Sequence, residues 1–114
     1  MSPLEFNIAR LESVSREIDP IRPGCRAWVA IDPYLDIDPD HPERPPPLRI
    51  RIRIVDIPIQ ELERRGWDLD GDEDFIADRL DVVVDGPEAV REVLDAAGID
   101  RDGLGPSFDS RLPF

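Results

Sequence analysis

The sequence contains no lysine and no threonine, and all fourteen of its positively charged residues are arginines. Without lysine the chain can supply neither the phosphate-binding lysine of a P-loop nor a Schiff base with a carbonyl substrate. Cys25 is the only cysteine, so neither an internal disulfide nor a zinc site built from several thiolates can form. These absences exclude several classes of enzyme and metal protein.

The chain also lacks long apolar stretches. No apolar run approaches the ~20 residues that a membrane-spanning helix needs. Residues 1–20 carry acids among their apolar positions and lack the apolar core of a signal peptide. We therefore expect a cytoplasmic protein, and its 114 residues suit a single domain, residues 1–114, with one core.

Acidic residues are in large excess, and the excess is uneven. Asp and Glu number 26 against 14 Arg, which gives a net charge of −12. Residues 1–57 hold ten acids and eight Arg (−2), whereas residues 58–114 hold sixteen acids and six Arg (−10). Negative potential repels phosphate backbones and anionic lipids and attracts basic proteins. The sequence predicts a basic protein partner and no nucleic-acid or membrane partner; the simpler alternative is that the charge only maintains solubility.

The clearest predicted element is a strand over residues 48–57, in which apolar residues and arginines alternate. The apolar set is Leu48, Ile50, Ile52 and Ile54, and the intervening set is Arg49, Arg51 and Arg53. A period of two is typical of an antiparallel strand with one buried face. A second strand is expected over residues 25–31. Six prolines among residues 33–47 predict a stiff surface loop, because proline lacks the amide donor that a sheet interior requires.

Helices are predicted mainly in the second half, over residues 58–65, 72–80 and 87–97, with a short strand at 82–84. Asp72 and Pro87 fit helix starts, and Gly66 and Gly98 fit helix ends. Residues 1–20 fit a helix or a strand equally well. The tail, residues 100–114, is loop-like, but it carries apolar residues that can dock: Phe108, Leu112 and Phe114. Together these elements predict an α+β domain in which an antiparallel sheet of about three to four strands packs with two to three short helices.

The arginine row has two interpretations. Arg49, Arg51 and Arg53 lie about 6.6 Å apart on one strand face, at ~3.3 Å per residue. They can bind an anionic ligand by bidentate hydrogen bonds. Alternatively, they pair with Asp and Glu on neighbouring strands, as charged residues commonly do.

An acidic run around Gly71 invites a calcium interpretation, because hard cations bind clustered carboxylates. The EF-hand pattern fails, however, because counting from Asp68 puts Glu73 at the sixth position and Arg79 at the twelfth. A solvated acidic surface is the simpler interpretation, and we predict no metal site.

Signals of catalysis are weak. His41, the only histidine, lies in the proline-rich loop beside Asp40, whereas a general base needs a positioned partner and a pocket. The serines lack the context of a nucleophile elbow. We assign no catalytic residue and no cofactor; an enzyme would need a pocket in which two carboxylates, or His41 and a carboxylate, converge.

The interpretation we favour is an acidic module that binds a basic partner protein. Small bacterial immunity proteins and antitoxin-like inhibitors are similar to this chain in size and acidity, although no family motif covers any part of it. Such an inhibitor can cover the cationic cleft of a nucleic-acid-binding enzyme, and charge steering speeds its association. The residues expected to contact the partner are an aromatic residue and the acids that follow it: Trp67, Asp68, Asp70, Asp72, Glu73, Asp74 and Asp78.

Overall fold

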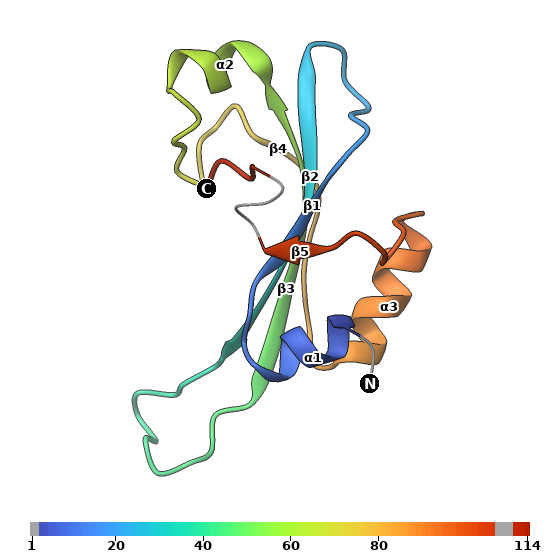
Figure 1. The fold of residues 1–114 in the computed structure, drawn as a ribbon. Coiled ribbons are helices and arrows are strands. Elements are labelled where there is room, and N and C mark those ends of the chain that lie inside the picture. Colours follow the sequence, from blue (N-terminus) through green and yellow to red (C-terminus); the bar gives the residue numbers. More distant parts are fainter. Residues whose placement is uncertain (1–2, 107–110) are drawn as a thin grey trace.

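The computed structural model describes residues 3–106 and 111–114 and confirms the predicted α+β class (Figure 1). An antiparallel sheet of four strands is accompanied by three short helices and a two-residue fifth strand. The elements in chain order are α1 (Pro3–Ala9), β1 (Val14–Ile18), β2 (Cys25–Leu35), β3 (Leu48–Pro58), α2 (Ile59–Arg64), β4 (Ala77–Val84), α3 (Pro87–Ala96) and β5 (Gly105–Pro106).

The strand order is β4-β3-β2-β1-β5, and every neighbouring pair is antiparallel. The β2–β3 hairpin is the longest pairing, running from Cys25 opposite Pro58 to Leu35 opposite Leu48. Strand β3 lies between β2 and β4 and pairs with both of them.

The buried side of β3 changes partway along the strand. Ile50, Ile52 and Ile54 project from one side of the sheet and are at most 4% exposed. After Ile54 the apolar positions become Val55 and Ile57, which project from the other side and are fully buried. The apolar alternation thus shifts phase by one residue, and the pairing with β4 is irregular at the same point, between Ile54 and Val55. One strand consequently serves two cores.

The two cores lie on opposite sides of the sheet and at opposite ends of it (Figure 1). On the side that we call the helical face, α1 and α3 cover one end, with Leu4 and Ile8 of α1 and Val90 and Leu94 of α3 buried. We call the other side of the sheet, which carries Arg49, Arg51 and Arg53, the arginine face. On this face the opposite end of the sheet is covered by α2 and the chain that follows it. Its buried residues are Trp28, Val55, Ile57, Leu62, Leu69 and Ile76.

The predicted helix over residues 72–80 is wrong, because strand β4 occupies Ala77–Val84. The capping signal at Asp72 is local, whereas β4 gains a full ladder of hydrogen bonds with β3. Strand geometry also places acids of β4 beside the arginines of β3. The predicted strand at 82–84 is the final part of this longer strand.

Other boundaries shift for local reasons. Strand β2 continues past the predicted end and includes Pro33. The first residue of β1, Val14, lies opposite Ile31, so beyond Ile31 the one described neighbour of β2 is β3. A proline nitrogen on such an open side costs no ladder hydrogen bond. Residues 1–20 contain both a helix, α1, and a strand, β1. The other predicted elements, 48–57, 58–65 and 87–97, match β3, α2 and α3 within a residue or two.

The tail docks as expected at its end. Leu112 and Phe114 pack against the core of the arginine face, and the amide of Leu69 donates to the carbonyl of Pro113 over 2.9 Å. Phe108 lies outside the described residues.

Leu62 tests the core on the arginine face. Its side chain is fully buried, so Leu62→Ala should lower the free energy of unfolding by about 2–4 kcal/mol, from lost burial and the cavity that remains. Ile59→Ala, on the same helix but 37% exposed, should cost about 1 kcal/mol or less. Urea denaturation of both variants measures the difference; equal losses would contradict a second core under α2.

Candidate partner-binding site

The segment between α2 and β4 forms the candidate site, and we call residues 68–74 the acidic loop. Two apolar side chains hold the segment against the sheet: Leu69 is 6% exposed, and Ile76, just after the loop, is 8% exposed. Because both join the buried core of the arginine face, the loop is fixed near each end rather than free to swing.

Hydrogen bonds and a close approach fix the middle of the loop. A side-chain oxygen of Asp70 accepts from the amide of Asp72 over 3.1 Å, and the amide of Glu73 donates to the carbonyl of Asp70 over 3.2 Å. The carbonyl of Gly71 accepts from Arg53 over 2.9 Å. A Cβ on Gly71 would lie 3.1 Å from the ring of Phe114, so this position is crowded and favours glycine.

Four carboxylates of the loop face solvent and take part in no ion pair of the described residues. Each is exposed, and none forms an ion pair with any residue in 3–106 or 111–114; the four are Asp68, Asp70, Asp72 and Asp74. The other two predicted contact acids are paired, Glu73 with Arg65 at 2.8 Å and Asp78 with Arg53 at 2.9 Å. The six acids, which are close together in the sequence, therefore lie in one area of the structure, and four of them form no ion pair.

Trp67 is packed within the protein beside this loop. Its half-buried ring meets Trp28 edge-on, with the ring centroids 6.1 Å apart. The guanidinium carbon of Arg26 lies 4.6 Å from the centroid of Trp67, and that of Arg111 lies 4.4 Å from it. The contact with Arg26 holds Trp67 against β2, and the contact with Arg111 holds the tail against Trp67, so Trp67 packs beside the acidic loop rather than projecting from it.

The arginine row forms a ladder of ion pairs across β3 and β4. Arg51 donates to both carboxylate oxygens of Asp81, over 2.9 and 2.7 Å. Arg49 pairs with Asp85 and with Asp36, and Arg53 pairs with Asp78. An anion at the row would have to displace these carboxylates, so the contacts agree with cross-strand pairing. The partner acids were missed because the helix predicted over 72–80 hid the alternation of β4.

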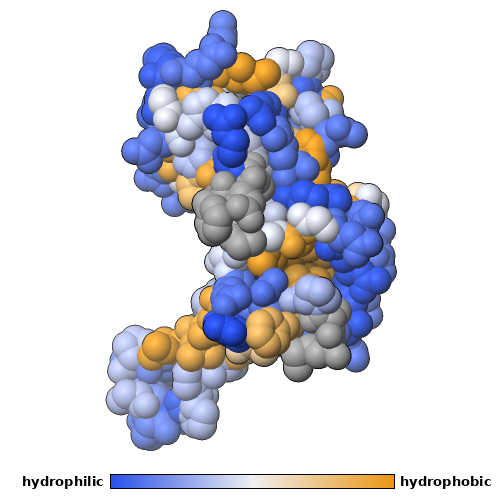
Figure 2. Space-filling view, viewed as in Figure 1, coloured by the Kyte–Doolittle hydropathy of each residue, from blue (hydrophilic) through white to orange (hydrophobic). Residues whose placement is uncertain are grey.

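The field around Arg51 shows how close the acidic loop comes to this ladder. The hydrogen bond with Asp81 chiefly raises the pKa of Arg51, and the charges of Asp72 and Asp78 raise it further. Because the carbonyl of Gly71 also accepts from Arg53 over 2.9 Å, the loop and the ladder lie side by side on the arginine face. Figure 2 shows a hollow on this side of the molecule, between the part near α2 and the projecting β2–β3 hairpin.

Part of the remaining acidity of the second half lies on α3. Glu88, Glu92 and Asp95 of α3 are exposed and make no ion pair within the described residues. Because α3 covers the helical face, these charges lie on the other side of the sheet from the acidic loop (Figure 1). The excess of acidic residues in the second half of the sequence is thus divided between two surfaces of the folded protein.

Among the described residues, no group of three His, Cys, Asp or Glu side chains is placed to hold a metal ion. His41 lies in the hairpin loop with its Nδ1 atom 3.4 Å from a carboxylate oxygen of Glu43, and both side chains are substantially exposed.

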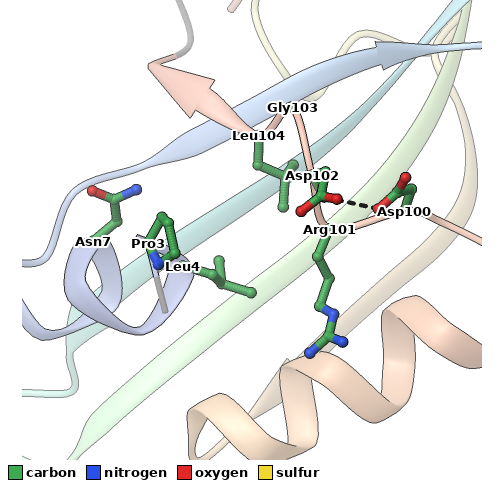
Figure 3. Close-up of a pocket in the computed structure, with 8 residues that line it drawn as sticks. All are labelled: Pro3, Leu4, Asn7, Asp100, Arg101, Asp102, Gly103 and Leu104. Carbon is green, nitrogen blue, oxygen red and sulfur yellow. Dashed lines mark hydrogen bonds between the residues drawn. The ribbon is translucent and has the colours of Figure 1, made fainter. Parts of the chain in front are cut away.

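A pocket of about 470 Å³ lies between α1 and the segment before β5 (Figure 3). Leu4 and Leu104 line it together with Asn7, and Asp100 uses one carboxylate oxygen to accept from the amide of Asp102 over 2.9 Å. The guanidinium of Arg101 points away toward α3. The polar groups of the pocket therefore do not converge on one point, which a specific ligand site requires.

Comparison of this chain with family models, with curated proteins and with solved structures finds no match. No helix in the described part of the chain is long and apolar enough to cross a membrane.

The Arg51–Asp81 pair makes a prediction about stability and pH. Hydrogen bonding to Arg51 lowers the pKa of Asp81, so the pair stabilises the fold above the ordinary aspartate pKa and loses this effect as the pH falls through the lowered value. Asp81→Asn should lower the free energy of unfolding at pH 7 by less than about 1 kcal/mol, because the pair is partly exposed.

The deficit of Asp81→Asn should shrink as the pH falls below about 4. Denaturation curves at several pH values measure it, with Asp74→Asn as the control because Asp74 is exposed and makes no ion pair among the described residues. A deficit that persists unchanged to about pH 2 would contradict the assignment.

Proposed function

We propose that this protein is an acidic interaction module that binds a basic partner protein, in the manner of an immunity- or antitoxin-type inhibitor acting in the cytoplasm. The observation that carries the proposal is the acidic loop: four aspartates, unpaired within the described chain, on a segment that is fixed at both ends. A fixed cluster of like charge costs little ordering entropy when a partner binds, and it accelerates encounter with a surface of opposite charge.

The surface next to the loop supports a cationic partner rather than an anion. Its three arginines are offset by the carboxylates of Asp36, Asp78, Asp81 and Asp85, and Asp32 projects from the same face opposite Arg51. Five acids against three arginines give this ladder a net negative charge, and the acidic loop adds the negative charges of four aspartates that form no ion pair. An anionic ligand would approach against this potential, whereas a basic protein would be attracted by it.

Paired baits test the proposal. Immobilised wild-type protein, an Asp70→Lys/Asp72→Lys variant and a Glu92→Lys/Asp95→Lys variant are exposed to lysate from the source cell. The two variants have equal net charge, but the second alters α3 on the opposite side of the sheet. The proposal predicts a basic protein that the wild-type and α3 baits retain and the acidic-loop bait loses.

The association kinetics of the captured protein then provide a quantitative check. Stopped-flow measurements should show the rate constant falling by about tenfold or more between about 0.05 M and about 0.5 M NaCl, because salt screens the steering field. Circular dichroism confirms that each variant is folded. Identical capture by all three baits, or an association rate indifferent to salt, would rule out the acidic loop as the contact surface.

A further inference from the structure

Strand β4 forms one edge of the sheet and has a free side. It is last in the strand order, and its eight residues, Ala77–Val84, pair only with β3 among the described strands. No backbone hydrogen bond joins β4 to any other segment in residues 3–106 or 111–114. Its outward amides and carbonyls are therefore a template for another strand.

The usual protection of an edge covers only half of β4. The irregular pairing at Ile54/Val55 distorts the first half, where Arg79 turns toward the buried carboxylate of Asp56, 2.6 Å away. From Leu80 to Val84 the pairing is regular, and this stretch contains no proline. Its one charged residue is Asp81, which disfavours pairing with an acidic strand but not with a basic one.

The apolar layer under α3 is also incomplete at this edge. Leu80, Val82 and Val84 project toward the helical face and pack against its core, yet all three are only partly buried. Val83, on the arginine face, is 51% exposed. A further strand with apolar residues opposite Val82 and Val84 would bury this rim.

Acids on the arginine face specify the charge of such a strand. Asp81 and Asp85 flank Val83 at four-residue spacing, about 13 Å at ~3.3 Å per residue. Their side chains are 36% and 80% exposed, so each can accept further hydrogen bonds besides those from Arg51 and Arg49. A strand paired antiparallel to residues 81–85 would place its first and fifth residues opposite these two acids.

We infer that the Leu80–Val84 edge binds an extended basic segment of the partner by strand addition, in the pattern basic–apolar–any–apolar–basic. The inference rests on the proposed function for the sign of the partner's charge and adds the mode of recognition. Main-chain hydrogen bonds supply affinity, and the side-chain pattern sets the register.

A second copy of this chain fits the edge poorly. Two β4 strands related by a two-fold axis would bring Asp81 and Asp85 of both copies together along one edge. Each copy also has a net charge of −12. Like charges along a shared ladder destabilise pairing, so a basic segment is the occupant that the charges favour.

Two synthetic peptides of equal composition test the inference. The first has the central sequence Lys-Val-Thr-Val-Lys and matches the spacing of Asp81 and Asp85. The second, Val-Lys-Thr-Lys-Val, has the same charge but cannot place both lysines opposite both acids in any register. Each is titrated into ¹⁵N-labelled protein, with backbone shifts and amide hydrogen exchange followed residue by residue.

The matched peptide should slow exchange of the outward amides in residues 80–84 by about tenfold or more at saturation. It should also bind about tenfold more tightly than the mismatched one, and Asp85→Asn should remove about threefold or more of its affinity. Asp95→Asn, the same change on α3, should leave that affinity unchanged.

The failures of the two proposals are distinguishable. Equal binding of both peptides, with shifts centred on the acidic loop and no slowing in β4, would overturn strand addition while leaving charge-driven binding intact. No binding by the matched peptide would also overturn strand addition, and the paired baits would then decide the proposed function alone. Outward β4 amides already protected in free protein that sediments as a dimer would show that a second copy occupies the edge.

Discussion

The change of phase in β3 governs the rest of the structure. A strand buried on one face needs apolar residues at every second position, and β3 obeys this rule twice with a one-residue shift at Ile54–Val55. Because Val55 and Ile57 face away from Ile52 and Ile54, a single layer of helices cannot cover both sets. The chain must therefore place α1 and α3 on one side of the sheet and α2 with its following segment on the other.

This diagonal arrangement determines which surfaces stay open. On the arginine face, the end of the sheet without a core carries Arg49 and Arg51, whose charges would be unfavourable beneath a packed helix. Carboxylates of β4 and of the hairpin neutralise them in place. Arg53 lies at the boundary, 5% exposed, with its guanidinium over the ring of Phe114 and hydrogen bonds to Asp78 and Gly71. The same side chain joins the ladder to the acidic loop and the tail.

Whether a feature of the fold could be predicted from the sequence depends on how far apart in the chain its interacting residues lie. The strand at 48–57 and the helix opened by Pro87 were predicted correctly because alternation, a helix start and Gly98 are local signals. The cap proposed at Asp72 is equally local, but it failed because β4 is set by pairing with β3, whose partner residues lie far away in the chain. Trp67 shows the same limit. Its surroundings come from Arg26 and Arg111, which approach it only after the hairpin and the tail have packed.

The distribution of charge shows why net charge alone is a poor guide to a binding surface. The second half of the chain carries ten more negative than positive charges, yet Asp78 and Asp81 are neutralised by arginines of the first half, and Glu88, Glu92 and Asp95 lie across the sheet on α3. What distinguishes the acidic loop is that its aspartates form no ion pair among the described residues while their backbone is held by buried side chains. Fixed charges need no reorganisation on binding, whereas charges on mobile side chains lose entropy when they are ordered. The anchoring by Leu69 and Ile76 is therefore as important to the proposed interaction as the carboxylates themselves.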